Sequence, residues 1–476
     1  MIQRLLKQRH SKSVSIFVGL LLALTLFGCD RSSPSNLAPS NLAPSNLAPS
    51  NPAPSNLAPT PGPRVNDIPT APSIVSQQQL DLFKDKKKVM LMISIDGFRF
   101  DYLKNLEVPH LKALMQSGVA AEGMIPSFPS LTFPNHISLV TGRTPGHHGI
   151  VSNTFYDKNR KETYSMGDGK TVNDGSWYKG EPIWTVLEQV GIKTATCFWV
   201  GSEAKINGID PTYIFPYDGK VTNVKRAEKT IEWLKMPESD RPQFITLYFS
   251  DVDTAGHSYG PDSKQVADAA TDIDSAIGNV MDYAKKAGLD MQYVVVSDHG
   301  MNVIETQRVS LYDFADLRDV TITEKGATTQ IYSDNATLID KVYADLKKNE
   351  SHYTVYRRSE IPARWKFDDP TRTGDLVVVA DFPYYIDTQK SFLPMNDDVQ
   401  KQVGRSTHGW DPANTNMQAL FIAQGSFFKS NLKIARFDNV NVYPMVLGLF
   451  GVQQSMKIDG DASVLAPILK TGTTAN

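Results

Sequence analysis

The stretch KKVMLMISIDG, residues 87–97, indicates the fold class of this 476-residue chain. It is a mostly apolar run that ends at Asp96-Gly97, and amphipathic stretches such as 225–236 and 266–288 follow it. Four later runs have the same form, at residues 193–202, 243–253, 292–301 and 417–425. Buried strands separated by helices are typical of a parallel sheet that is covered on both faces. We therefore expect an α/β fold with a doubly wound, mainly parallel sheet and helices on both faces.

Polar side chains follow several of these predicted strands. Asp96, Asp253 and the pair Asp298-His299 each lie within a few residues of a strand end. In open α/β sheets the ligand lies beyond the carboxyl ends of the strands. These side chains are therefore expected to converge on one edge of one sheet.

Residues 130–142, SLTFPNHISLVTG, predict a helix that begins at Thr132 and stops at Gly142. Threonine is favoured as an N-cap and proline in the first helical turn. Two interpretations stay open for Thr132. It is an ordinary cap, or it is a nucleophile, because the unpaired N–H groups of a helix N-terminus favour an anion.

Three aspartates and three histidines form the candidate metal set, and they offer only oxygen and nitrogen donors. The set consists of Asp96, Asp253, His257, Asp298, His299 and His408. Such donors suit zinc or a similar divalent ion. Each pair alone is more often a hydrogen-bonded turn. Two metals about 4 Å apart would clamp both oxygens of an in-line displacement, and one bound to Thr132 would activate its hydroxyl without a histidine base.

The N-terminal residues have the pattern of an export signal. Residues 1–12 carry four Lys or Arg, and the mainly apolar run 14–28 is short for a membrane span. We expect a signal peptide over residues 1–28. Leu26-Phe27-Gly28-Cys29 resembles a bacterial lipobox, which implies a lipid anchor on Cys29 at the periplasm or cell surface. A plain secretory signal is the alternative.

Five SNLAP-like pentapeptides over residues 35–59 predict a semi-rigid tether, with a fibrous or adhesive repeat as the alternative. The expected organisation is a lipidated N-terminus and tether over 29–85, a catalytic domain over 86–470 and a tail over 471–476. Cys29 and Cys197 are the only cysteines, so no structural disulfide is expected. The net charge of −2 and the lack of a basic stripe argue against a nucleic-acid partner.

Six segments together carry a family resemblance. They are SIDGFRFDYL (94–103), TFPNHISLVTGRTPGHHGIVSNTFYD (132–157), WYKGEPIW (177–184), DVDTAGHSYGP (251–261), VVVSDHGM (294–301) and the run from STHGWDP (406–412) to MQALFIAQG. Over nearly all of residues 88–455 the chain resembles the nucleotide pyrophosphatase/phosphodiesterase family of the alkaline phosphatase superfamily. The resemblance implies two zinc ions. Asp253, His257 and His408 would hold one, and Asp96, Asp298, His299 and the Thr132 oxygen the other.

The resemblance also implies substrate contacts. Asn153 matches an amide that steadies a phosphoryl oxygen together with the backbone N–H near Thr132. Tyr217 matches a base-stacking tyrosine, with Phe133 as the opposite plate and Tyr248 lining the pocket. Two rings around a base are a sequence-tolerant form of recognition. The alternative is that all three aromatic residues belong to the core.

The segment after Trp199 bears on the substrate. Where monoesterases of the superfamily have a Lys-x-Arg pair, this chain has WVGSEA with Glu203, which favours a diester. Lys205 and Arg405 are cations without an assigned role. The chain keeps the segment that nucleotide-cleaving members keep, although Val200 departs from the usual Trp-Pro-Gly-Ser.

The sequence therefore predicts an exported, monomeric di-zinc phosphodiesterase that releases nucleoside 5′-monophosphates from nucleotides or similar diesters. Thr132 would attack phosphorus and form a phospho-threonine intermediate. A phosphomonoesterase, a lipid-headgroup phosphodiesterase and a catalytically silent surface lipoprotein are the alternatives.

Overall fold

The structure, a computed structural model, describes residues 72–387 and 405–470. The expected signal peptide, Cys29, the pentapeptide repeats and the tail 471–476 lie outside the described residues. Within the described ranges, no helix combines the length and apolar character needed to cross a membrane.

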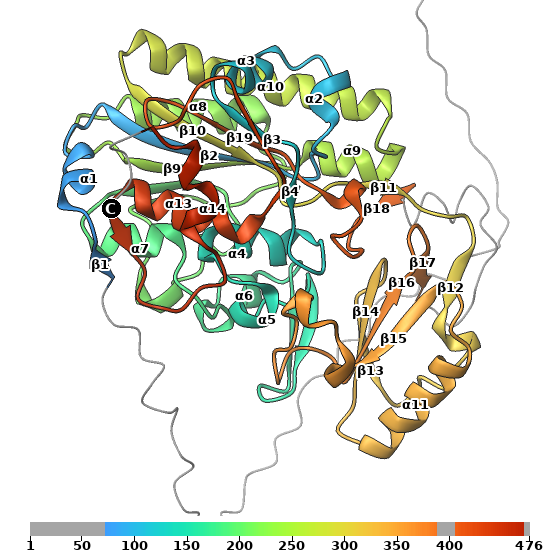
Figure 1. The fold of residues 1–476 in the computed structure, drawn as a ribbon. Coiled ribbons are helices and arrows are strands. Elements are labelled where there is room, and N and C mark those ends of the chain that lie inside the picture. Colours follow the sequence, from blue (N-terminus) through green and yellow to red (C-terminus); the bar gives the residue numbers. More distant parts are fainter. Residues whose placement is uncertain (1–71, 388–404, 471–476) are drawn as a thin grey trace, which may run out of the picture. The chain divides into compact units, whose positions relative to one another are not determined.

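The central feature is an eight-stranded sheet with the strand order β20-β3-β19-β10-β2-β9-β7-β8 (Figure 1). Its strands are β2 (Lys88–Ile95), β3 (Val119–Ala121), β7 (Thr194–Cys197), β8 (Tyr213–Phe215), β9 (Phe244–Phe249), β10 (Asp290–Val296), β19 (Phe421–Gln424) and β20 (Leu432–Ile434). β10, β2, β9, β7 and β8 run parallel to their neighbours in this group. The predicted mainly parallel α/β sheet is confirmed.

β19 departs from the parallel pattern. It pairs antiparallel with both β10 and β3, although its apolar run 417–425 resembles those of the parallel strands. A strand buried on both faces is apolar whichever way it runs. The sequence pattern therefore reports burial here and not strand direction.

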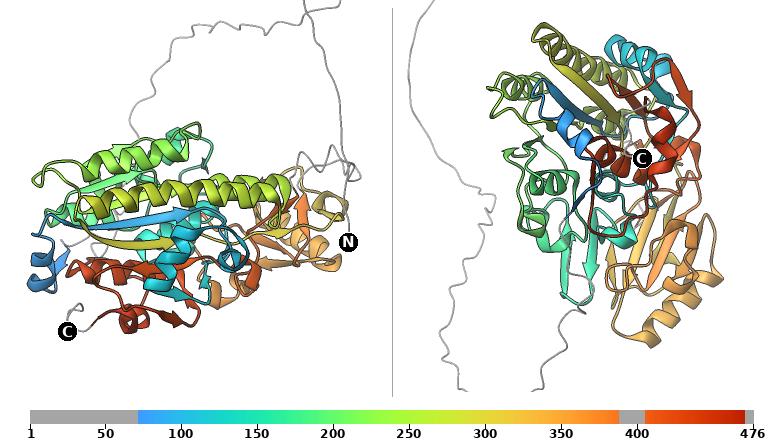
Figure 2. Two further views of the ribbon diagram at one scale, coloured as in Figure 1. Left: turned by 90° about the horizontal axis from the view of Figure 1, so that it is seen from above. Right: turned by 60° about the vertical axis from the view of Figure 1, so that its left-hand side comes forward.

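Helices cover both faces of the sheet, because alternate residues of β2 face opposite sides. Met90 and Met92 pack with one group of helices, and Leu91 and Ile93 pack with the other. The first group comprises α4 (Thr132–Thr141), α7 (Ile183–Gln189) and α13 (Val442–Leu449). The second comprises α3 (Pro109–Ser117), α8 (Asn223–Leu234), α9 (Asp251–Tyr259) and α10 (Lys264–Lys286) (Figures 1 and 2).

A second sheet lies between β10 and β19 in the chain, and the sequence analysis did not predict it. It is antiparallel, in the order β13-β14-β16-β15, and α11 packs on it through Ile339, Val342 and Leu346. The elements are β13 (Thr321–Thr323), β14 (Thr328–Tyr332), α11 (Ala336–Lys348), β15 (Tyr353–Arg357) and β16 (Leu376–Ala380). We call residues 304–387 the insertion (yellow to orange in Figure 1).

Short strand pairs and helices complete the body. The pairs are β1 (Ser73–Ile74) with β22 (Val452–Gln453), β4 (Met124–Ile125) with β21 (Phe437–Asp438), β5 (Thr154–Asp157) with β6 (Glu162–Ser165), β11 (Asn302–Val303) with β18 (Ser406–Thr407), and β12 (Arg308–Ser310) with β17 (Tyr385–Asp387). The short helices are α1 (Gln77–Leu82), α2 (Tyr102–Asn105), α5 (Pro145–His148), α6 (Gly169–Val172) and α14 (Ala462–Leu465).

The packed body begins before the predicted boundary at residue 86. β1 pairs with β22, and Phe83, directly after α1, is buried in the core and stacks on Phe450. The end of the expected tether, residues 73–85, is therefore part of the body. Its polar composition concealed this, because a single buried aromatic residue anchors the segment.

Candidate active site

The strand ends bring the predicted polar residues to one edge of the large sheet. Asp96 follows β2 directly, and Asp298 and His299 lie just past the end of β10. α9 begins two residues after β9 and carries Asp253 and His257 one helical turn apart, so they share one face of the helix. His408 follows β18, which comes from the far side of the insertion in the chain.

Gly97 makes the approach of α9 to β2 possible. Its φ is +67°, and a Cβ atom at this position would lie 3.0 Å from the Cα and Cβ atoms of Asp253. Only glycine adopts this conformation readily while leaving that space. The Gly97 N–H also donates to Asp298 Oδ1 at 3.1 Å. The turn after β2 therefore positions the carboxylates of both Asp253 and Asp298.

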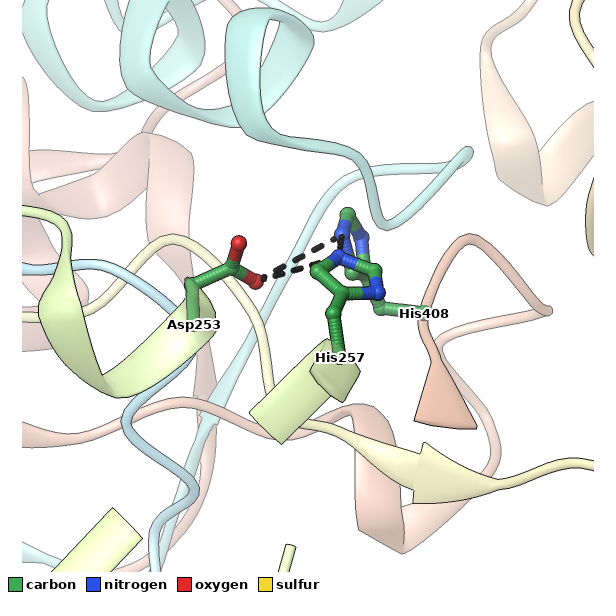
Figure 3. A group of neighbouring side chains, drawn as sticks. All are labelled: Asp253, His257 and His408. Carbon is green, nitrogen blue, oxygen red and sulfur yellow. Dashed lines mark hydrogen bonds and ion pairs between the residues drawn. The ribbon is translucent and has the colours of Figure 1, made fainter. Parts of the chain in front are cut away.

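Three of the residues form what we call the open cluster: Asp253, His257 and His408. Each offers an atom within 4.8 Å of the other two (Figure 3). Asp253 Oδ1 lies 3.5 Å from His257 Nε2 and 3.7 Å from His408 Nε2. The His257 side chain is 35% exposed, so this cluster is accessible from solvent.

The backbone sets the tautomer of each histidine. The Nδ1–H groups of His257, His299 and His408 donate to the carbonyl oxygens of Ser406, Gly300 and Ser130, each at 2.9 Å. A neutral ring held in this way presents a bare lone pair at Nε2. In the open cluster the Nε2 atoms of His257 and His408 lie 3.1 Å apart. Two facing lone pairs at that distance favour a cation between them, and a hydrogen bond from Nδ1–H to a backbone carbonyl is typical of metal-ligating histidines.

The other residues form the buried cluster: Asp96, Asp298 and His299. His299 Nε2 is at its centre, 3.0 Å from Asp298 Oδ2 and 3.5 Å from Asp96 Oδ1. The His299 ring stacks on the His408 ring with centroids 3.5 Å apart, so the two clusters adjoin. Asp253 also lies within reach of Asp96 and His299 and therefore faces both.

Electrostatics test whether these residues fit a metal. Asp96 Oδ1, Asp253 Oδ1 and Asp298 Oδ2 are buried and accept no hydrogen bond. Burial raises the pKa of Asp96 well above its usual range, and the charges of Asp298 and Asp253 raise it further. Burial lowers the pKa of His408 well below its usual range, and His299 and His257 add to the shift. A divalent cation would compensate the crowded carboxylates and accept the Nε2 lone pairs. The residues fit such a cation.

Thr132 opens α4 but does not cap it. The helix begins at Thr132, as predicted, its N-cap is Leu131 and no side chain caps it, so the interpretation of Thr132 as an ordinary cap is wrong. As the first helical residue it directs its Oγ1 to within 3.1 Å of His299 Nε2. Gly142 ends the helix in the left-handed region, as predicted. The hydroxyl thus lies against the buried cluster, free of any capping role.

Asn153 lies next to Thr132, although twenty-one residues separate them in the chain. Its Oδ1 accepts a hydrogen bond from the Phe133 N–H at 2.9 Å. Because an N–H donor requires the carbonyl oxygen as its partner, Nδ2 remains the donor that the amide offers. The hydrogen bond from the Phe133 N–H therefore holds the Asn153 amide against the N-terminus of α4.

Two buried side chains, His136 and Tyr248, support the clusters through hydrogen bonds. Neither has a free lone pair for a metal. His136 Nδ1 lies 2.9 Å from the Thr132 carbonyl, its Nε2 lies 2.9 Å from Ser94 Oγ, and Asp298 is 3.4 Å away. The Tyr248 hydroxyl donates to Asp96 Oδ2 at 2.6 Å. His136 was not among the candidate residues that the sequence analysis selected. Its position four residues after Thr132 was the available signal, because i and i+4 share a helix face.

A cavity of about 580 Å³ opens above the clusters. Phe133, Tyr217 and Tyr248 line it together with Asp96, Thr132 and Asp253, so these aromatic residues do not belong wholly to the core. Tyr217 is 55% exposed, and its backbone N–H donates to Glu203 Oε1 at 2.7 Å. Glu203, a lining residue itself, therefore holds Tyr217 in place.

The two unassigned cations do not line this cavity. Lys205 is exposed and pairs with Asp210 at 3.1 Å, and Arg405 is exposed on the surface, with its backbone N–H donating to the His257 carbonyl. Among the described residues that line the cavity there is neither lysine nor arginine.

Solved structures with a similar fold identify the class. Human ectonucleotide pyrophosphatase/phosphodiesterase 5 matches with a TM-score of 0.74 and 29% identity, over 81% of this chain and 100% of that chain. The murine protein, in an inactive threonine-to-alanine variant in complex with AMP, matches with the same TM-score and identity over 80% of this chain. The fold is alkaline-phosphatase-like, as predicted.

Sequence comparison identifies the family. The model described as type I phosphodiesterase / nucleotide pyrophosphatase matches residues 90–411. An uncharacterised pyrophosphatase/phosphodiesterase of Schizosaccharomyces pombe is 31% identical over 75% of this chain and 76% of its own length. The chain belongs to this family. Human family member 1 is 33% identical over 76% of this chain, which spans only 40% of that relative's length.

Proposed function

We propose that this protein is a metal-dependent phosphodiesterase that cleaves phosphodiester or phosphoanhydride bonds and releases nucleoside 5′-monophosphates. The main support is the convergence of the Thr132 hydroxyl and the two Asp/His clusters at the base of one aromatic-lined cavity. The nitrogen and oxygen donors suit two zinc ions. Asp253, His257 and His408 would hold one, and Asp96, Asp298, His299 and Thr132 the other.

When bound, the ions supply Lewis-acid stabilisation of phosphoryl oxygens and lower the pKa of a hydroxyl ligand. Thr132 Oγ1 attacks phosphorus, the bond to the leaving group breaks, and a phospho-threonine forms. Water then hydrolyses it and restores the hydroxyl. The Asn153 amide donates to a phosphoryl oxygen through Nδ2, and Tyr248 orients Asp96. The murine relative solved with AMP, described as inactive with its threonine replaced by alanine, supports a threonine nucleophile.

The cavity favours a diester over a monoester. A phosphomonoester dianion carries more charge than a diester, and the lining offers no lysine or arginine among the described residues to balance it. Phe133 and Tyr217 both line the cavity and would receive a base by stacking, which tolerates any base because each has a π-face. A lipid-headgroup diester remains the second candidate, since the same metal clusters would act on it.

The N-terminal part of the proposal concerns location. A signal peptide over 1–28, a lipid on Cys29 and the pentapeptide tether would hold the catalytic body outside the cytoplasm near a membrane. Several relatives carry names of ectoenzymes or venom enzymes. Labelling of the intact protein with a radioactive fatty acid, abolished by Cys29→Ser, tests the anchor.

Paired hydrolysis assays test the activity. With zinc present, the protein is given the nitrophenyl ester of thymidine 5′-monophosphate, nitrophenyl phosphate and a nitrophenyl ester of phosphocholine. Preference for the nucleotide ester supports the proposal. Preference for the monoester or the choline ester selects one of the alternatives, and bound metal without turnover of any substrate would favour a binding protein.

A further inference from the structure

Glu324 of the insertion reaches the site through the segment that carries Asn153. Glu324 follows β13, and its Oε2 accepts hydrogen bonds from the Thr154 N–H at 2.9 Å and from Ser152 Oγ at 3.1 Å. These donors flank Asn153 on both sides. One carboxylate oxygen therefore fixes the backbone on either side of the amide proposed to contact the phosphoryl group.

The backbone at Glu324 is itself unusual. Its φ is +66°, in the left-handed region that L-residues other than Asn, Asp and Gly seldom adopt. Such a conformation persists where the surroundings hold it, and it is concentrated at functional sites. Here the turn places the side chain against Ser152, which precedes β5, and Thr154, the first residue of β5.

The contacts continue from Glu324 to the nucleophile. With its neighbours held, Asn153 bonds through Oδ1 to the N–H of Phe133, the residue after Thr132. The Asn153 carbonyl accepts from the N–H of Met166, which lines the cavity. A shift of the 152–154 segment would therefore move the amide relative to Thr132.

We propose that Glu324 is a positioning residue for phosphoryl transfer: its carboxylate fixes Asn153 against the N-terminus of α4 and links the insertion to the chemical step. This inference rests on the proposed function, because it assumes that Asn153 stabilises the reacting phosphoryl group. Glu324 touches neither the clusters nor the cavity lining, and it acts only through Asn153.

The charge on Glu324 is set by its surroundings. Burial raises its pKa to about 7, against the opposing effect of the Ser152 and Thr154 hydrogen bonds. The titratable and charged side chains on the elements around it are Tyr156 and Asp157 of β5, Tyr332 of β14, Arg308 of β12, and Tyr385 and Asp387 of β17. Asp157 is paired with Arg372 at 2.8 Å, and Arg308 lies over the Tyr385 ring. Because Glu324 is ionised mainly above about pH 7, its charge strengthens the hydrogen bonds from Ser152 and Thr154 only there.

Glu324→Gln tests the role of the charge, because glutamine keeps the shape and one acceptor oxygen. On thymidine 5′-monophosphate nitrophenyl ester, we expect kcat about tenfold lower at about pH 8 with KM within about twofold, and a ratio near one at about pH 5.5. In an Asn153→Ala background the same change should cost almost nothing, because the two residues act as one unit. Glu360→Gln, an exposed insertion carboxylate bonded to Tyr343, is the matched control and should leave kcat unchanged.

Stability separates this role from a structural one. The folded-state pKa is raised, so ionisation of Glu324 between about pH 4.5 and 7 disfavours the folded state. The Tm of Glu324→Gln at about pH 8 should therefore equal or exceed that of the unchanged protein while kcat falls. Three results would overturn the proposal. The ratio of kcat between Glu324→Gln and the wild-type protein would not change with pH, or Glu324→Gln would lower kcat as much in the Asn153→Ala background as in the wild-type protein. The third result is a loss of activity that follows a loss of Tm.

A measurement without turnover distinguishes the two levels of inference. Amide hydrogen exchange over residues 150–155 should become faster in Glu324→Ala and stay unchanged in Glu360→Gln. If the wild-type protein cleaves no diester, the proposed function fails. If amide exchange over residues 150–155 is also the same in Glu324→Ala as in the wild-type protein, the positioning contact fails as well. If the protein is active and Glu324→Gln matches it at every pH, only the positioning role fails.

Discussion

The open and buried clusters lie side by side but differ in their supports and exposure. Asp96, Asp298 and His299 of the buried cluster are almost inaccessible and follow the two central parallel strands, β2 and β10. The open cluster combines a helix, α9, with a loop from the far side of the insertion, and its His257 is 35% exposed. Rigid strand ends hold the charges that burial makes costly, whereas the solvent-facing residues come from more peripheral elements. We expect the chemical step to depend most on the buried cluster.

The largest expected effect tests whether the nucleophile belongs to the buried cluster. Thr132→Ala should reduce kcat by about 10⁴-fold or more, because a residue that forms the covalent bond has no substitute nearby. Bound metal, measured by atomic absorption, should be largely retained. Thr271→Ala, on the surface of α10, is the control. Full activity in Thr132→Ala would rule out the covalent intermediate.

Replacing one acidic or histidine side chain in each cluster compares them directly. Asp298→Asn should lower kcat/KM by about 10³-fold, equivalent to about 4 kcal/mol of transition-state stabilisation, because it removes a charged ligand of the proposed buried metal. His257→Asn, at an exposed position, should lower it by about 10–100-fold.

The Tm of the metal-free protein tests the same two variants, Asp298→Asn and His257→Asn. Without metal, Asp298→Asn should lower the Tm at neutral pH, because, against the opposing effect of burial, His299 and His136 hold the pKa of the Asp298 carboxyl far below its usual range, and the ionised group therefore stabilises the folded state. His257→Asn should leave the Tm of the metal-free protein nearly unchanged. Equal losses of activity in the two variants would contradict the assigned division between the clusters.

The next largest effect is expected at Asn153, the uncharged side chain proposed to donate to the phosphoryl group. Asn153→Ala should reduce kcat by about 10²-fold with little change in KM, since a donor to developing charge acts mainly in the transition state. Asn159→Ala, at an exposed turn of the same hairpin, serves as the matched control. A rise in KM without loss of kcat would instead place Asn153 in ground-state binding.

The smallest effect concerns the aromatic wall of the cavity. Loss of stacking on one base costs about 1–3 kcal/mol, so Tyr217→Ala should raise KM for the thymidine ester by about tenfold. The KM for a nitrophenyl methyl phosphonate or phosphate diester without a base should not change. Tyr259→Ala, equally exposed but outside the cavity lining, is the comparison. An equal rise for both substrates would mean that Tyr217 shapes the cavity and does not bind the base.

Local patterns were sufficient to predict much of the fold and the candidate set. The apolar run of β2 ending at Asp96 and the spacing of Asp253 and His257 are features of adjacent residues. Parallel strands bring their carboxyl ends together, so these features were enough to predict that the clusters would lie at one edge. The resemblance to the family added Asn153 and the aromatic residues.

Features that depend on distant parts of the chain were missed or mispredicted. The direction of β19 depends on its neighbours, and the pairing of β1 with β22 joins segments almost 380 residues apart. Glu324 has no sequence signal at all, since its partners precede it by about 170 residues.

The sequence by itself determined which chemical groups this protein possesses and that its central strands are buried, because side-chain type and hydrophobic periodicity are local properties. Only the tertiary structure decided which lone pairs face one another, which carboxylate oxygens lack a donor, and that a glutamate of the insertion holds Asn153. Those relations depend on distances between remote residues, and burial changes the energy of each charge according to neighbours that no local pattern reveals.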